Sequence, residues 1–146
     1  MDVKLADIAM ACVTECERQY VGLDRLAALL TGYAYAIEQT DRLPTEGDLL
    51  HLAGVVEPTT MGRYRRQPVV FAHGGSAAAQ DEVPGAVAWM FALLDRDTDP
   101  TDFVRALLAV HPFVDGNGRV AFVLHNWLRG TLADPGLLPD LFGEEG

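Results

Sequence analysis

Apolar residues recur three and four positions apart along most of the chain, the spacing that places them on one face of an α-helix. Two series near the N-terminus share it: Leu5, Ile8, Cys12 and Cys16, then Leu23, Leu26 and Leu30. A third helix is expected from Thr45, because a threonine followed three residues later by Asp48 is typical of a helix N-cap. The pattern therefore predicts a mainly α-helical protein.

The C-terminal half shows equally clear helix boundaries. Pro84 favours the first turn of a helix, and Asp99 followed by Pro100 favours the start of another. The helix that begins there is expected to end near His111, since Pro112 disfavours helical geometry in the residue before it. A last helix is predicted over about 117–128, closed by Gly130.

The stretch from Glu57 to His73 interrupts the helical pattern. It contains Pro58, Gly62 and Pro68, followed by the β-prone run 69–71. Such a segment is typical of a small hairpin. We therefore expect a short β-hairpin near residues 62–71.

Length and composition restrict the class of protein. The chain has 146 residues, no internal repeat and no composition change that would mark a boundary, so we expect one domain over 1–146. No apolar run reaches the roughly 20 residues of a membrane helix, and the N-terminus does not resemble a signal peptide, so we expect a cytoplasmic protein without a membrane partner.

The charge and the cysteines add little chemistry. A net charge of −10 with one lysine argues against nucleic acid as a partner. The acidic surface serves either solubility or a basic partner, and nothing localises it. Cys12 and Cys16 have no further Cys or His at metal-ligand spacing, so we interpret them as core residues in a reducing compartment.

The candidate chemistry lies in the nine residues His111-Pro112-Phe113-Val114-Asp115-Gly116-Asn117-Gly118-Arg119. A helix that begins here exposes unpaired N–H groups, and the two glycines allow a ligand to approach the backbone, which together suit a phosphate. Arg119 adds a cation, Asp115 adds a ligand for Mg²⁺, and His111 adds a proton acceptor. Each residue alone has an ordinary role in a turn or at a surface. Their concentration within nine residues indicates a phosphate-handling site.

This segment resembles the signature of the Fic family, HPFx(D/E)GNGR, and matches it at every specified position. The run Gly62-Arg63-Tyr64-Arg65, with the β-prone residues after it, is similar to the family's flap, a hairpin that docks the target. Asn126 matches a common asparagine of the following helix. The resemblance covers about residues 20–132 and implies a Fic-type helical bundle with a short β-hairpin flap.

The resemblance implies an activity. Fic enzymes typically transfer AMP from ATP to a Ser, Thr or Tyr hydroxyl of a protein and release pyrophosphate. Carried across, His111 is the general base and Asp115 holds Mg²⁺.

The same resemblance assigns the remaining residues of the motif. The backbone of Gly116, Asn117 and Gly118 forms the hole for the donor's phosphates, and Arg119 contacts a phosphate. The Doc branch, which phosphorylates its target, has lysine where this chain has Gly118. The glycine favours nucleotidyl transfer.

One position departs from the family. Many Fic enzymes carry a second arginine that binds the γ-phosphate, and Phe122 stands there in this chain. The inhibitory motif (S/T)xxxE(G/N), whose Glu pairs with that arginine, is also absent from the sequence. Three explanations stay open: a donor without a γ-phosphate, such as a CDP- or UDP-linked group; ATP held instead by Arg63 or Arg65; or action on a small molecule.

Three hypotheses follow. The first is a Fic transferase that modifies a protein hydroxyl using ATP or another nucleotide. One form of this hypothesis is that the protein is a toxin with an antitoxin as its partner. The second is a divergent enzyme with a non-ATP donor or a small-molecule acceptor. The third is a binding module without turnover, against which the intact His111 and Asp115 argue.

Overall fold

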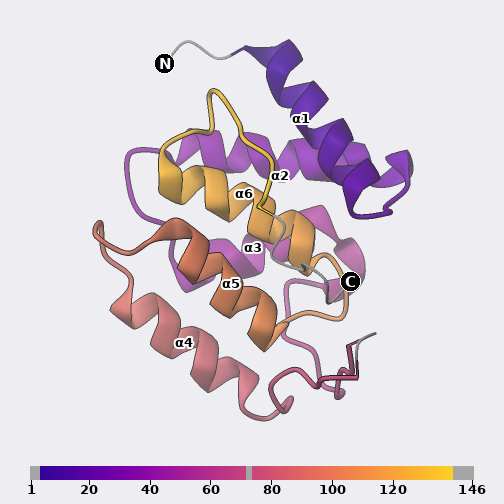
Figure 1. Ribbon diagram of the computed structural model, residues 1–146, viewed down its shortest axis with the longest axis vertical. Helices are drawn as coiled ribbons and strands as arrows, with labels where there is room; N and C mark the ends of the chain where they lie inside the picture. Colours follow the sequence, from indigo (N-terminus) through magenta and orange to yellow (C-terminus); the bar gives the residue numbers. More distant parts are fainter. Residues whose placement is uncertain (1–3, 72–73, 140–146) are drawn as a thin grey trace.

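The computed structural model describes residues 4–71 and 74–139. Six α-helices and two short 3₁₀ segments follow one another in these residues (Figure 1): α1 (Leu5–Arg18), η1 (Leu23–Arg25), α2 (Leu26–Glu38), α3 (Glu46–Val56), η2 (Pro58–Thr60), α4 (Val83–Leu93), α5 (Pro100–Val110) and α6 (Asn117–Arg129). The mainly α-helical fold is therefore confirmed. None of the described helices is long and apolar enough to span a membrane.

Helix α6 lies at the centre of the bundle. It packs against α1, α2, α3 and α5, and Figure 1 shows it between α2 and α5. Every side chain from Val120 to Trp127 is buried. The N-terminus of α6, where the sequence motif ends, is consequently fixed by the whole core, whereas α4 packs on α3 and α5 at the edge.

The helix boundaries agree with the local sequence signals. Thr45 and Asp48 form a reciprocal capping box, in which the Asp48 N–H donates to Thr45 and the Thr45 N–H donates to Asp48. The Asp99 carboxylate accepts hydrogen bonds from two backbone N–H groups of the first turn of α5. Gly130 ends α6 in the left-handed conformation, with φ 72°.

The prediction of a β-hairpin near residues 62–71 is wrong. Among residues 4–71 and 74–139 no strand forms, and only an isolated antiparallel bridge joins Val70 to Ser76. The backbone from 62 to 67 does not pair with itself, because the Arg65 N–H donates to the Pro112 carbonyl at 2.9 Å. Pro68 also lacks the N–H group that a ladder would need. A hydrogen bond to the motif loop therefore replaces hairpin pairing at Arg65, while backbone hydrogen bonds join Val69 to Ala77 and Phe71 to Gly75.

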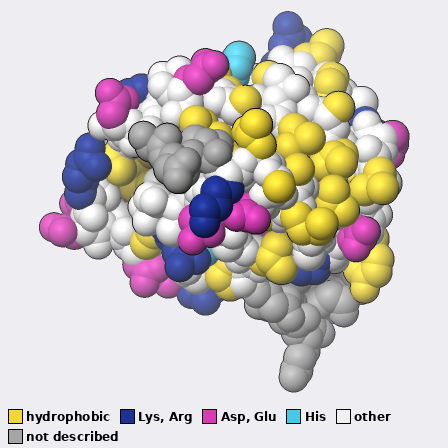
Figure 2. All heavy atoms as spheres, turned by 90° about the horizontal axis from the view of Figure 1, so that it is seen from above, with side chains coloured by type: hydrophobic (Ala, Val, Ile, Leu, Met, Phe, Trp, Pro, Cys, Tyr) yellow, Lys and Arg dark blue, Asp and Glu magenta, His cyan; other side chains and the backbone are white. Residues whose placement is uncertain are grey.

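Helix α1 presents apolar residues on two faces. Its inner face carries Ile8, Cys12 and Cys16, all buried, and burial raises the pKa of Cys12 to about 12. Its outer face exposes Leu5 and Met10. Figure 2 shows apolar side chains gathered on the right of the face seen from above, the side on which α1 lies in Figure 1. The two cysteines are thus core residues, as the sequence predicts.

Candidate active site

His111 lies directly after α5, where the chain leaves the helix. Its N–H still donates to the Leu107 carbonyl, at 2.9 Å, but its backbone is left-handed, with φ 54°. This conformation is uncommon for a residue with a Cβ and persists only where the surroundings impose it. It turns the chain out of α5 and into the motif loop.

Arg65 supplies that constraint. Its Nε donates to the His111 carbonyl at 2.6 Å, and its Nη2 donates to the Val110 carbonyl at 3.1 Å. The same guanidinium donates to the carbonyls of Gln67 and Ala78. Because the side chain is only 3% exposed and its donors bind backbone carbonyls, Arg65 holds the motif loop and is not free to extend toward the start of α6.

The environment of the His111 ring favours its neutral form. The ring is half-buried and meets Phe71 edge-on, with centroids 5.5 Å apart. Burial lowers the pKa of His111, the positive charge of Arg65 lowers it further, and Asp115 opposes both. At neutral pH the ring therefore has a nitrogen free to accept a proton.

The start of α6 offers a row of backbone donors. Gly116 precedes the helix in the left-handed conformation, with φ 83°, and the Asn117 side chain ties the loop by exchanging hydrogen bonds with the backbone of Phe113. Within the described residues, no partner is recorded for the N–H groups of Asn117, Gly118 and Arg119. Three free donors at the positive end of a helix dipole form a cradle for an anion.

Asp115 stands at the outer edge of this cradle. Its side chain is 63% exposed, and only its Oδ1 is engaged, by the Gly116 N–H at 2.7 Å and by Arg119 at 3.4 Å. No group of three or more potential metal ligands occurs in the part of the chain that the structure describes. Such a lone carboxylate fits Mg²⁺, which commonly takes one or two carboxylates together with substrate phosphates.

Arg119 is engaged differently from what the sequence implies. Its guanidinium donates to Glu57 at 3.0 Å and to the Val56 carbonyl at 3.2 Å, and the side chains of Arg119 and Glu57 are 2% and 1% exposed. Arg25 pairs with the other oxygen of Glu57 at 3.3 Å. In this arrangement the charge of Arg119 is neutralised inside the protein, and a phosphate contact would require competition with Glu57.

Two residues that the sequence did not single out lie against the cradle. A Cβ on Gly116 would come within 2.9 Å of the Glu57 Cβ, and a Cβ on Gly118 would overlap the Gln19 side-chain amide. Gln19 is oriented by Glu15, which is buried and accepts from its Nε2 at 2.7 Å. The only sequence signal for Glu57 is its position at the end of the apolar run 49–56, and Gln19 has none.

The other residues of interest fall into two groups. Phe122 and Asn126 are fully buried on α6, where Phe122 packs against Tyr33 with centroids 5.9 Å apart and Asn126 binds backbone groups of the C-terminal segment. The flap residues lie beside the motif instead: Tyr64 stacks on Phe113, and Arg63 is exposed. The structure therefore brings residues 62–65 next to the motif loop without forming a hairpin.

The geometry of this loop agrees with a comparison of the sequence against protein families. A family model described as the Fic/DOC family matches residues 43–128. The chain belongs to the Fic/DOC family. The match spans residues from before α3 to near the end of α6, so it includes residues 62–65 as well as the whole motif. No curated protein sequence matches the chain.

Solved structures support the same fold. A Fic domain-containing signalling protein from Bacteroides thetaiotaomicron superposes with a TM-score of 0.53 and 24% identity, over 71% of this chain and 46% of that one. Fic-1 from C. elegans superposes with a TM-score of 0.55 and 22% identity, over 76% and 38%. The aligned region is less than half of each of these two Fic proteins.

Proposed function

We propose that this Fic protein transfers a nucleotidyl group, with AMP as the first candidate, from a nucleotide donor to the hydroxyl of a protein Ser, Thr or Tyr. The observation that supports the proposal most is the short loop joining a neutral His111 to the three free amides at the start of α6. A proton acceptor and an anion cradle within nine residues are the two groups that attack of a hydroxyl on phosphorus needs.

In this reaction the ring nitrogen of His111 takes the proton of the acceptor hydroxyl. The hydroxyl oxygen then bonds to the α-phosphorus, the bond from that phosphorus to the bridging oxygen breaks, and pyrophosphate leaves when the donor is ATP. The amides of Asn117, Gly118 and Arg119 stabilise the phosphate oxygens. Mg²⁺ held by Asp115 would neutralise charge on the donor's phosphates.

The donor is where this chain differs most from its family. Arg119 is bound to Glu57, and Arg65 is bound to backbone carbonyls, so neither guanidinium is available for a γ-phosphate in this conformation. Phe122 faces the core. We propose that the γ-phosphate adds little to donor binding, and that Gln19 moves aside or contacts the donor when a phosphate enters the cradle.

The same observations favour a second candidate, in which the donor is a diphosphate-linked group or the acceptor is a small molecule. A role as a toxin controlled by an antitoxin is compatible with either candidate. The two candidates differ in the mass that is added and in the molecule that receives it.

A donor screen tests both candidates. The purified protein is incubated with Mg²⁺, a bacterial lysate and each nucleoside triphosphate or diphosphate-linked donor, and adducts are identified by mass spectrometry. His111→Ala should abolish the adduct, since loss of a general base typically lowers the rate about 10²–10⁴-fold. His51→Ala, which changes an exposed histidine of α3, is the matched control and should label normally. Equal labelling by His111→Ala and wild type would refute the proposal.

Calorimetry separates the donor hypotheses. If the γ-phosphate is not recognised, ATP and ADP should bind with affinities within about tenfold, because a charge-assisted contact would contribute more than that. A strong preference for ATP that disappears in Arg63→Ala would instead show that Arg63, the remaining candidate, binds the γ-phosphate.

A further inference from the structure

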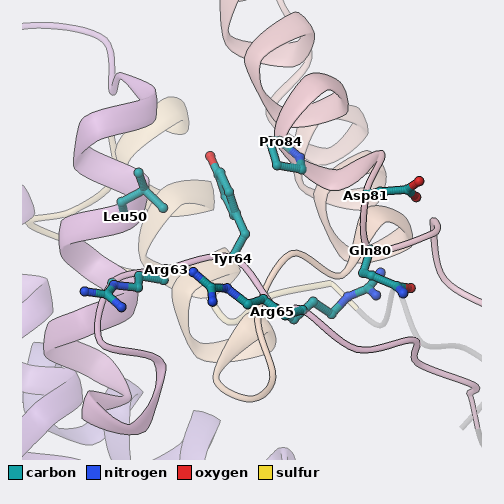
Figure 3. A pocket seen from close by; sticks show the side chains of 9 residues that line it. Leu50, Arg63, Tyr64, Arg65, Gln80, Asp81 and Pro84 are labelled. Atoms are coloured by element: carbon teal, nitrogen blue, oxygen red, sulfur yellow. The ribbon is translucent and has the colours of Figure 1, made fainter.

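A separate pocket lies beside the motif loop. Its volume is about 480 Å³, and it is bounded by Leu50 of α3, by residues 62–66 and by Gln80, Asp81 and Pro84 at the start of α4. Figure 3 shows Leu50 and Pro84 on opposite sides, with the Tyr64 ring between them. None of its lining residues contributes to the phosphate cradle at α6, so the pocket is available for a different group.

The pocket concentrates positive charge in an acidic protein. Arg63 and Arg66 line it and are exposed, and no ion pair or hydrogen bond of either side chain is recorded among the described residues. Arg65, between them, is bound to backbone carbonyls and has no carboxylate partner. Five of the other arginines are paired with carboxylates, namely Arg18, Arg25, Arg42, Arg105 and Arg119, and the two that are not paired within the described part of the chain, Arg96 and Arg129, lie far from one another in the sequence. In a chain of net charge −10, three arginines within the four residues 63–66 favour an anionic ligand.

The pocket is joined to the motif loop by hydrogen bonds from Arg65 and by a ring contact of Tyr64. The Arg65 backbone N–H binds the Pro112 carbonyl, and the Arg65 side chain binds the carbonyl of His111. The Tyr64 ring lies 5.8 Å from that of Phe113. A polypeptide whose hydroxyl reaches His111 would therefore pass near Arg63 and Arg66.

We propose that this pocket binds an acidic side chain, Asp or Glu, of the protein acceptor and so selects hydroxyls in an acidic sequence context. The two free guanidinium groups would bind the carboxylate, and Leu50, Pro84 and the Tyr64 ring would contact its methylene groups. Asp81 lines the same pocket and disfavours ligands of higher negative charge, so a carboxylate fits better than a phosphate. This inference rests on the proposed function in one respect, that the acceptor is a protein.

The test uses two fluorescein-labelled nonapeptides, each with a central tyrosine, flanked by glutamates in one and by glutamines in the other. Anisotropy should show the glutamate peptide binding at least about tenfold more tightly, and Arg63→Gln or Arg66→Gln should each weaken its binding about tenfold. Asp81→Asn should tighten binding about threefold, because it removes a like charge. Arg96→Gln, an exposed arginine in the loop after α4, removes the same charge elsewhere and should change little.

Three results would overturn the inference: equal binding of the two peptides, equal weakening by Arg96→Gln, or binding of inorganic phosphate at this pocket in preference to the glutamate peptide. The measurement needs no turnover, so the peptides are also tested with His111→Ala. Selective binding of the glutamate peptide without any labelling of hydroxyls would reject the proposed transferase activity and support glutamate binding at the pocket. Equal labelling of the glutamate and glutamine peptides would support the transferase activity and reject the selection of an acidic context.

Discussion

The buried pair of Glu57 and Arg119 gives the sharpest prediction on stability. Glu57→Ala leaves the Arg119 guanidinium, 2% exposed, without its carboxylate. Removing one partner of a buried ion pair typically costs about 3–5 kcal/mol, because the remaining charge is uncompensated. The Val56 carbonyl at 3.2 Å and Asp115 at 3.4 Å still contact the guanidinium, so we expect the lower value, about 3 kcal/mol. For a domain of this size that corresponds to a fall in Tm of about 10 °C.

The dependence of this contribution on pH follows from Glu57. Burial alone would raise its pKa, but hydrogen bonds from Arg119 and Thr59 and the charges of Arg119 and Arg25 outweigh burial and lower the pKa below 4.5. A carboxylate whose folded pKa is depressed stabilises the protein above its unfolded pKa. The contribution is therefore complete at neutral pH and is lost as the pH falls below 4.5 and through the folded value.

Urea denaturation followed by circular dichroism measures the effect, and a double-mutant cycle isolates the pair. Adding Arg119→Met to Glu57→Ala should restore about 2 kcal/mol, since the second change removes the orphaned charge. Arg105→Ala, which breaks an exposed ion pair with Asp102, is the control and should cost no more than about 0.5 kcal/mol. A loss below about 1 kcal/mol for Glu57→Ala, or strict additivity in the cycle, would refute the reasoning.

Three further changes probe the loop and the core. Because the pKa of His111 is lowered, activity should fall only at a pH below 6.5, and a pH–rate profile with an acid limb centred above that value would contradict the base assignment. Arg65→Lys should lose about 2–3 kcal/mol of folding free energy, since an ammonium cannot reach four carbonyls, and a variant with unchanged urea denaturation would argue against the clamp. Phe122→Arg buries a charge beside Tyr33 and should cost more than about 3 kcal/mol, so a stable variant with a selective gain for ATP would show that residue 122 can face the donor.

The helix boundaries were accessible to sequence reasoning because their determinants are local. Thr45 caps a helix with a residue three positions away, Asp99 caps the next turn, and Gly130 needs only its own backbone freedom. The change of direction at His111 was likewise indicated by the proline that follows it. In each case the groups that interact lie within about one turn of one another.

The contacts that define the site were not accessible in the same way. Glu57 and Arg119 are separated by 62 residues of sequence. The nine-residue motif therefore gives no sign of Glu57, and Arg119 is read from it as a free cation although it is paired in the structure. The predicted hairpin is wrong for a related reason, since the Arg65 backbone N–H donates to the Pro112 carbonyl, far away in sequence, and not to a neighbouring strand. Both the state of Arg119 and the absence of the hairpin depend on tertiary contacts, which no local sequence pattern contains.

Arg65 also closes a loop. Its guanidinium binds the carbonyls of Gln67 and Ala78, so the chain leaves the clamp at one of these residues and returns to it at the other. The length of chain between them does not enter the carbonyl contacts of Arg65, although Phe71 in this segment meets the His111 ring. Doubling a flexible loop costs only about 0.6 kcal/mol of closure entropy. Insertions between positions 74 and 77, which leave Phe71 in place, should therefore be tolerated without disturbing the motif loop, which makes this segment a natural place for an epitope tag or for sequence divergence among homologues.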